Sequence, residues 1–156
     1  MGIGTDSPAA PLDVVSDSSA EIARLRGRSS DNIGTLYFQD NAGSTNYAYI
    51  QSRSTYFDIA TDTTIPLRFT TNQVERLSIS SSGDITPGAD ATQDLGATDK
   101  RFANIYSADL QLSNEGSSND VDGTWGKYTI QEGEDDLFLI NRRTGRKYKF
   151  NLTEVE

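Results

Sequence analysis

The stretch LSISSSGDITPGADATQDLGATDKRFANIYSADLQL, residues 77–112, separates two β-rich regions of the chain. Within residues 99–109, three apolar side chains at positions i, i+3 and i+4 predict one face of a short helix: Phe102, Ile105 and Tyr106. A helix of about two turns has almost no stability alone in water. We therefore expect it to pack between two β segments with these three side chains buried. The alternative is an ordinary surface turn of helix in a β-domain.

Upstream of this stretch, short runs of aromatic and β-branched residues alternate with turn residues, as β-strands do. These runs predict strands near Glu21–Arg26, Gly34–Gln39, Asn46–Ser52, Thr55–Thr61, Leu67–Thr71 and Arg76–Ser80. Some strands carry apolar or aromatic residues on both faces, as in Leu36-Tyr37-Phe38 and Ala48-Tyr49-Ile50. Such strands predict a sheet that is covered on both sides or packed at an interface between chains.

Downstream, the region from Trp125 to Leu152 predicts a three-stranded β-meander. Its middle strand, Leu137–Ile140, is apolar on both faces. In its last strand, apolar and polar residues alternate strictly, with Tyr148, Phe150 and Leu152 on one side and Lys147, Lys149 and Asn151 on the other. An isolated three-stranded sheet is marginally stable. We therefore expect other chains to cover its apolar face.

The composition also indicates a core that one chain does not complete. Of 156 residues only 35% are hydrophobic, and they occur in short scattered groups. The 23 acidic and 14 basic residues give a net charge of −9, which argues against nucleic acid and anionic membranes as partners. No apolar run approaches the roughly 18 residues of a membrane span, so we expect no membrane insertion. We expect an all-β, elongated body.

The sequence offers little for catalysis. The absence of histidine and cysteine removes the usual bases, nucleophiles and soft metal ligands. Two carboxylates held a fixed distance apart would still suffice to cleave a glycan, and the candidates are Asp84, Asp90, Asp94 and the cluster Glu132, Glu134, Asp135 and Asp136. All lie in turn-rich sequence, where acidic residues are expected in any case, so we predict that the chain is not an enzyme.

The loop Asn119–Gly123 alternates oxygen-bearing side chains and ends in glycine, as calcium-binding loops do. It lacks the later bidentate glutamate at the required spacing. We therefore expect no metal ion and no cofactor.

A basic cluster stands out on this acidic chain: Arg142, Arg143, Arg146, Lys147 and Lys149. With Trp125 and Tyr128 nearby to stack on sugar rings, it is a candidate receptor-binding site for acidic, sulfated or phosphorylated glycans. The alternative, which we favour, is that the cluster pairs with the acidic turn Glu132–Asp136 of its own meander or of a neighbouring chain.

Several short motifs follow one another in a fixed order. At the N-terminus they are Gly2-Ile3-Gly4-Thr5-Asp6-Ser7-Pro8 and Leu12-Asp13-Val14. In the centre they are Arg76-Leu77 with Ile79, Ser81-Ser82-Gly83-Asp84, Pro87-Gly88, Asp94-Leu95-Gly96, Lys100-Arg101-Phe102 and Ile105-Tyr106. R-L-R-G, L-Y-F-x-D-N and R-F-T-T-N lie between them. In this order the motifs resemble those of bacteriophage tail-fibre and tailspike proteins.

The resemblance implies an intertwined homotrimeric fibre of the β-prism or triple-stranded β type, with one short helical turn and a small C-terminal β-meander. Residues 1–19 would form the shaft entry, 20–93 the β-rich fibre body, 94–113 the helical-turn junction and 114–156 the C-terminal knob. We expect the trimer core at Phe102, Ile105, Tyr106, Leu137, Leu139, Tyr148, Phe150 and Leu152.

The same resemblance implies a virion fibre or spike segment, assembled in the host cytoplasm. It would present or form a binding surface for host cell-surface glycans and act by multivalent binding without catalysis. Its partners would be its own copies, other virion tail or baseplate proteins and the host glycan. The alternative is a purely structural appendage or trimerisation module without receptor contact. A glycan depolymerase is the third, disfavoured class.

Overall fold

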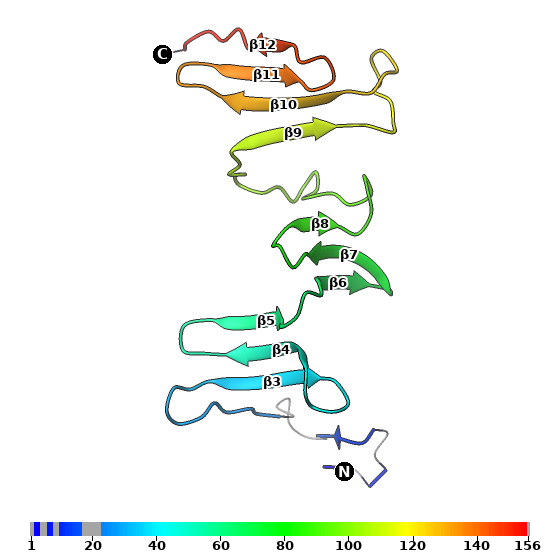
Figure 1. Ribbon diagram of the computed structural model, residues 1–156, viewed down its shortest axis with the longest axis vertical. Helices are drawn as coiled ribbons and strands as arrows, with labels where there is room; N and C mark the ends of the chain where they lie inside the picture. Colours follow the sequence, from blue (N-terminus) through cyan, green and yellow to red (C-terminus); the bar gives the residue numbers. More distant parts are fainter. Residues whose placement is uncertain (1, 4–5, 8–9, 17–22, 156) are drawn as a thin grey trace. The chain divides into compact units, whose positions relative to one another are not determined.

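The computed structural model describes residues 2–3, 6–7, 10–16 and 23–155 of the chain, which separates into two units, Met1–Leu95 and Gly96–Glu156 (Figure 1). Across the described residues the protein is all β, as the sequence predicts, and contains no helix. It forms two three-stranded sheets and one four-stranded sheet, all antiparallel and open. A short parallel pair, β1 (Gly2–Ile3) and β2 (Asp13–Val14), precedes them.

The first sheet has the order β3-β4-β5 and is a simple meander. Its strands are β3 (Gly34–Gln39), β4 (Asn46–Ser52) and β5 (Phe57–Thr61). The predicted bounds of β3 and β4 are confirmed residue for residue. In the turn between them, Asp40 accepts hydrogen bonds from the Ser44 amide (2.8 Å) and hydroxyl (2.7 Å).

The second sheet has the order β6-β7-β8, with β6 (Leu67–Thr71), β7 (Val74–Ile79) and β8 (Ile85–Pro87). Asn72 and Gln73 join β6 to β7 with φ of 50° and 63°, the left-handed pair that a two-residue hairpin turn uses. Between β7 and β8, the S-S-G-D motif forms a turn in which Ser80 N donates to Asp84 O (2.9 Å).

The third sheet has four strands in the order β12-β11-β10-β9. They are β9 (Asp109–Ser113), β10 (Lys127–Glu132), β11 (Leu137–Asn141) and β12 (Lys147–Lys149). The sequence predicts three of them as a meander. The fourth, β9, joins because Leu110 and Leu112 pair directly with Ile130 and Tyr128. The last strand ends at Lys149, earlier than the alternation up to Leu152 predicts.

The predicted helical turn is wrong. Residues 99–109 lie in irregular structure up to the start of β9, and Ala97 and Lys100 form an isolated antiparallel bridge. Gly96, at φ 94°, directs the chain into this bridge. Three apolar residues at helical spacing carry too little energy to offset helix nucleation. In the single chain they are exposed: Phe102 by 59%, Ile105 by 74% and Tyr106 by 95%.

The predicted strand Glu21–Arg26 is also not found where the structure describes it. Residues 23–26 form no strand, and residues 21–22 lie outside the described part of the chain. The segment instead leads into a turn closed by the Arg28 amide, which donates to Ile33 O (3.1 Å).

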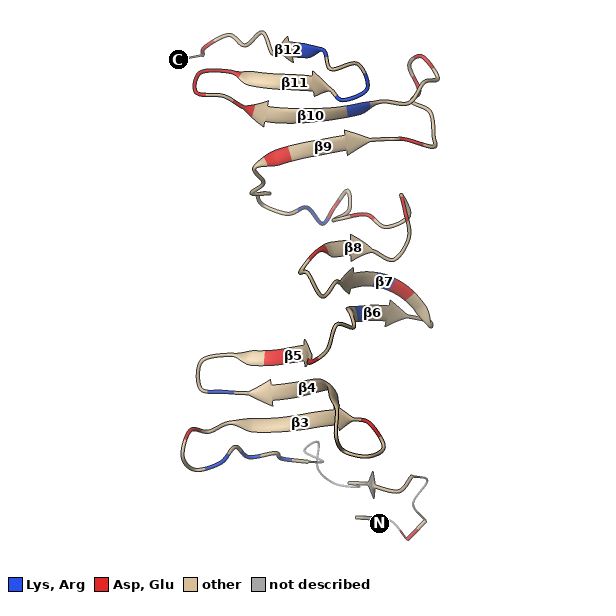
Figure 2. Cartoon of the chain, in the orientation of Figure 1, with Lys and Arg blue, Asp and Glu red and all other residues tan. Residues whose placement is uncertain are grey.

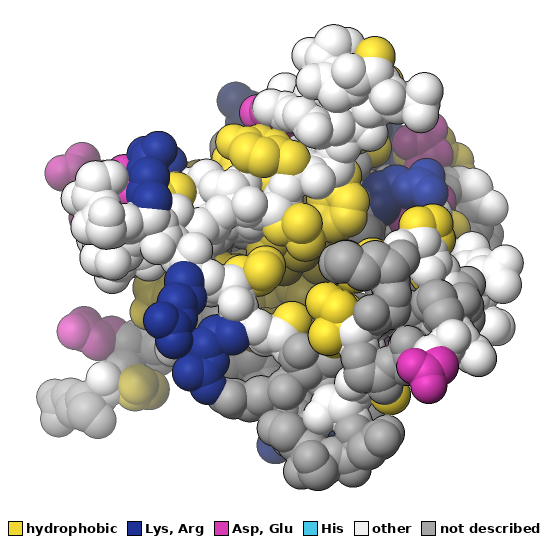
Figure 3. All heavy atoms as spheres, turned by 90° about the horizontal axis from the view of Figure 1, so that it is seen from below, with side chains coloured by type: hydrophobic (Ala, Val, Ile, Leu, Met, Phe, Trp, Pro, Cys, Tyr) yellow, Lys and Arg dark blue, Asp and Glu magenta, His cyan; other side chains and the backbone are white. Residues whose placement is uncertain are grey.

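The described part of the chain has no apolar core of its own. Among the described residues no hydrophobic side chain is buried, and the two buried residues, Gln51 and Thr129, are polar. The accessible surface is 13529 Å², whereas even two separate compact domains of these lengths would expose about 9,300 Å². Hydrophobic side chains lie open at the surface (Figure 3).

The turn between β7 and β8 provides a stability test. Gly83 has φ 95°, and an added Cβ would meet no atom within 4 Å, so alanine would suffer only from the backbone conformation. Gly83→Ala should therefore lower the free energy of unfolding by about 1 kcal/mol or more. Denaturant unfolding of the protein, followed by circular dichroism, measures this loss.

The matched control is Gly34→Ala in β3. Gly34 is not among the residues with positive φ, and an added Cβ would have its nearest neighbour at 3.4 Å. This change should leave stability unchanged or raise it slightly, because alanine restricts the unfolded chain. Equal losses in both variants would show that the conformation of the S-S-G-D turn does not matter.

Candidate functional site

The first sheet has one largely apolar face. Directly paired residues of neighbouring strands lie on the same face, and the pairs Leu36–Ile50 and Ile50–Ile59 form one row across β3, β4 and β5. The apolar members of the face are Leu36, Phe38, Ala48, Ile50, Phe57 and Ile59, and Ser52 and Thr61 share it at its ends. The large side chains remain open, with Phe57 63% exposed and Ile59 54% exposed.

The second sheet repeats the arrangement. Pairing of β6, β7 and β8 places six apolar residues on one face: Leu67, Phe69, Leu77, Ile79, Ile85 and Pro87. Sequence reasoning missed this face, although the signal was present in the alternation of L-R-F, L-S-I and I-T-P along the three strands.

The third sheet also has an apolar face, and it contains much of the predicted trimer core. Its members on the four strands are Leu110, Leu112, Tyr128, Ile130, Leu137, Leu139 and Tyr148, with Glu132 at one end and Asn141 at the other. Phe150 N donates to Leu137 O (3.0 Å), which keeps Phe150 beside β11. The other predicted core residues lie outside the sheet: Phe102, Ile105, Tyr106 and Leu152.

On the opposite faces, uncharged polar side chains pair across the strands. Gln51 Nε2 donates to Thr35 Oγ1 (2.8 Å), and the Thr129 hydroxyl donates to Gln111 Oε1 (2.6 Å). In the second sheet the hydroxyls of Ser78 and Thr86 lie 3.0 Å apart. Charged residues gather at turns and strand ends (Figure 2), and β3, β4, β8 and β11 carry none. Each sheet is therefore amphipathic.

The structure brings Trp125 and Arg143 together. Cζ of Arg143 lies 3.8 Å from the centroid of the Trp125 ring, and Nη1 donates to Trp125 O (2.6 Å). The Arg143 amide donates to Asn141 Oδ1 (2.9 Å), which fixes the turn that carries the arginine. A guanidinium held flat in this way presents its remaining N–H groups at the surface, in the fork geometry that suits a carboxylate or sulfate.

The other members of the basic cluster have partners other than Trp125. Arg142 Nε donates to Thr129 Oγ1 (2.7 Å), and Lys149 pairs with Asp136 at 2.8 Å. The second contact is the pairing with the acidic turn that we favoured from the sequence. Lys147 pairs across from Ile140 and Arg146 is exposed in the turn before β12.

Tyr128 lies apart from this group. It pairs with Leu112 on the apolar face, whereas Lys147 shares the face of Thr129. Its hydroxyl accepts a hydrogen bond from Asn141 Nδ2 (3.0 Å). The structure therefore places Tyr128 and Lys147, which the sequence put in one site, on opposite faces of the sheet.

The candidate acidic residues serve turns. Asp84 accepts from the Ser82 hydroxyl (2.7 Å) within the S-S-G-D turn. In the loop Asn119–Gly123, Asp122 Oδ1 accepts from Asn119 Nδ2 (2.7 Å) and from the Thr124 hydroxyl (2.8 Å). The hydrogen bond from Asn119 is the largest cause that lowers the pKa of Asp122. These oxygens are thus engaged by their own loops.

Comparison of the chain with protein-family models, with curated proteins and with solved structures gave no match. Over the described residues, no helix has the length and apolar character needed to cross a bilayer.

The Trp125–Arg143 stack has a spectroscopic consequence. The chain has a single tryptophan, so its fluorescence reports this site alone. Arg143→Ala removes the guanidinium from the Trp125 ring and exposes the ring to water. The tryptophan emission should therefore shift to longer wavelength, and acrylamide should quench the fluorescence more strongly. Arg146→Ala removes the same charge from the same turn and should leave both properties unchanged. Identical spectra for Arg143→Ala and the wild type would exclude the stack in solution.

Proposed function

We propose that this chain is a segment of a homotrimeric bacteriophage fibre or spike. Its copies pack their apolar faces together in a shared interior, and the assembled fibre positions or forms a contact with the host cell surface. It binds without catalysis. Its partners are its own copies, other tail or baseplate proteins of the virion, and a surface glycan.

The observation that carries the proposal is the open apolar face of each of the three sheets. The accessible surface of 13529 Å² exceeds that of two separate compact units by about 4,200 Å². Obligate interfaces bury roughly 2,000–5,000 Å² and resemble a domain core. An excess of this size is what a chain without its obligate partners would retain.

The faces themselves support packing against identical copies. The apolar face of the first sheet carries no charged side chain, so like faces meet without bringing the net charge of −9 together in the interior. Closed symmetric assemblies are the usual form of homo-oligomers. The number three comes from the motif resemblance to tail fibres.

The basic turn supports surface binding. Arg143 is held flat against Trp125 at the rim of the third sheet and offers a planar cation beside an aromatic ring. Three such sites on one rigid body would bind together, so that weak single contacts give a durable attachment.

The assembly can be tested with two separate variants, each of which introduces one carboxylate at neighbouring positions of the same strand. In β7, Leu77 lies on the apolar face and Ser78 on the polar one. The wild type should scatter light as a particle of about 51 kDa, three times the 17.0 kDa of one chain. Leu77→Asp should abolish the trimer, because the introduced carboxylates would be buried unpaired in the shared interior.

Ser78→Asp adds the same charge on the opposite face and should remain trimeric. A wild-type chain that behaves as a compact 17.0 kDa monomer would refute the assembly. Trimers in both variants would show that the apolar face of the second sheet is not the interface.

Attachment can be tested on the intact trimer. Trp125→Ala and Arg143→Ala should each weaken binding of the labelled protein to a panel of bacterial strains about tenfold or more, because three linked sites lose affinity together. Arg101→Ala, an equal loss of charge in another loop, is the control. If the wild-type trimer attaches to no strain, the structural appendage is the better description.

A further inference from the structure

The polar face of the first sheet has features that assembly through the opposite face does not require. Three cross-strand pairs line it along β3 and β4: Thr35–Gln51, Tyr37–Tyr49 and Gln39–Asn46. β5 adds Asp58, directly across from Gln51, and Ala60, across from Tyr49. The face thus combines amide, hydroxyl and phenol groups with a single carboxylate.

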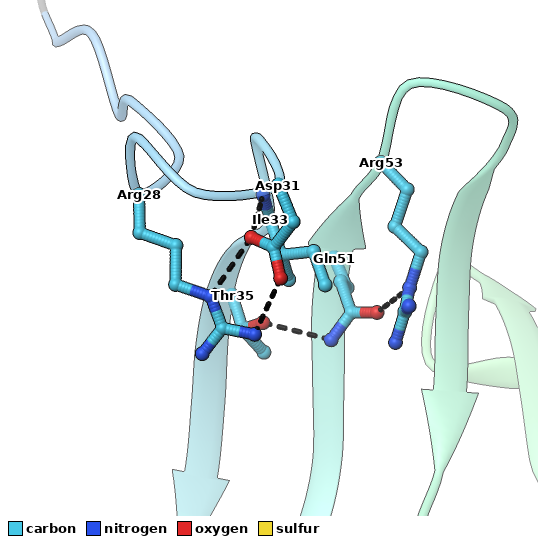
Figure 4. A network of polar contacts seen from close by, with 6 residues as sticks. All are labelled: Arg28, Asp31, Ile33, Thr35, Gln51 and Arg53. Atoms are coloured by element: carbon cyan, nitrogen blue, oxygen red, sulfur yellow. Dashed lines mark hydrogen bonds and ion pairs between the residues drawn. The ribbon is translucent and has the colours of Figure 1, made fainter.

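Mutual hydrogen bonds hold these polar side chains in place (Figure 4). Gln51 donates from Nε2 to Thr35 Oγ1 (2.8 Å) and accepts at Oε1 from Arg53 Nε (2.6 Å). Gln51 is only 7% exposed, so the middle of this network is shielded from water. Gln39 Nε2 donates to Asn46 Oδ1 (2.8 Å) at the other end of the row. Groups ordered in advance lose little entropy when a ligand binds.

Arg53 is part of this ordered edge. Its Cζ lies 5.4 Å from the centroid of the Tyr56 ring. On the neighbouring turn, Arg28 forms two hydrogen bonds with Asp31, at 2.8 and 2.6 Å. These bonds lower the pKa of Asp31 to about 2, so the pair stays ionised at neutral pH and fixes the entry to β3. Two arginines and one aspartate leave a single excess positive charge at this border, which the carboxylate of Asp58 on the face offsets.

Two tyrosines interrupt the polar row. The rings of Tyr37 and Tyr49 meet edge to face, with centroids 5.8 Å apart and planes at 60°. Tyr37 remains 47% exposed. Tyrosine provides a rigid apolar surface at low entropic cost and keeps a hydroxyl for hydrogen bonding. A ring edge and a ring face are thus available in the middle of a hydrogen-bonding surface.

Asp58 supplies an unused acceptor. It is half-buried beside Gln51, and none of the residues that the structure describes donates to its carboxylate or pairs with it. A half-buried carboxylate of this kind favours a ligand that brings hydroxyl donors. It disfavours an anionic ligand, because like charges repel.

We propose that this face binds a neutral glycan. A pyranose ring has apolar C–H faces that lie on aromatic rings, and hydroxyls that donate to and accept from amides and carboxylates. Tyr37, the exposed amide of Gln39 and Asp58 offer those complements. A nucleic acid or an acidic glycan would meet Asp58 and the net charge of −9. The multivalency of this site rests on the proposed trimer, in which inward apolar faces leave this face outward.

The test is an array of neutral and acidic oligosaccharides probed with the full-length protein. The wild type should bind neutral members. Tyr37→Ala and Asp58→Ala should each raise the half-saturating concentration about tenfold or more, as loss of a central contact does. Tyr37→Phe keeps the ring and should retain most of the binding. Tyr106→Ala, which removes an exposed tyrosine from the second unit of the chain, is the matched control.

A second measurement on the wild type avoids any dependence on folding of the variants. Hydroxyl-radical footprinting with a bound array glycan should protect Tyr37 and Tyr49 and leave Tyr106 unprotected. Binding to no neutral oligosaccharide would overturn the proposal, as would neutral binding that survives Tyr37→Ala and Asp58→Ala. Binding lost only in Trp125→Ala would assign the glycan to the basic turn, which would refute this site and leave the proposed function standing.

Discussion

An open apolar sheet face is the constraint on which this structure depends. Each of the three sheets gathers most of its apolar side chains on one face, although Phe138 and Ile140 lie on the other face of the third sheet. Among the described residues none of these apolar side chains is buried. Burying one such side chain fully is worth about 1.5–3 kcal/mol, whereas a cross-strand hydrogen bond contributes about 1 kcal/mol. In the proposed assembly the apolar faces would therefore contribute most of the energy, and the polar pairs mainly secure the register.

Register decides which side chains face the interior, and the turns set the register. A slip of one residue would move every apolar side chain of a strand to the polar face. The two-residue turn Asn72–Gln73 and the S-S-G-D turn at Gly83 fix the pairing of β6, β7 and β8, because their positive φ values allow only short connections of one kind. The motifs that mark the sequence are thus the parts that determine the faces.

Sequence patterns predicted what is local. The bounds of β3 and β4 follow from the aromatic and apolar run between clear turn signals. The helix at Phe102 failed because three residues at helical spacing are too weak a signal for so short a segment. The site was only partly predictable: Trp125 and Arg143 stack, but Tyr128 lies on the opposite face from Lys147, which depends on cross-strand pairing that no single segment encodes.

Under the proposed function, the alternation of side chains would give assembly and recognition separate surfaces on the same strands. In β3, Leu36 and Phe38 belong to the apolar face, while Thr35 and Tyr37 belong to the hydrogen-bonded one. Because each class occupies alternate positions, the outward residues can change without altering the packing of the inward ones, provided that the turns hold the register. A chain built in this way can keep one mode of assembly while its outer surface varies, which is what a protein that contacts variable cell surfaces requires.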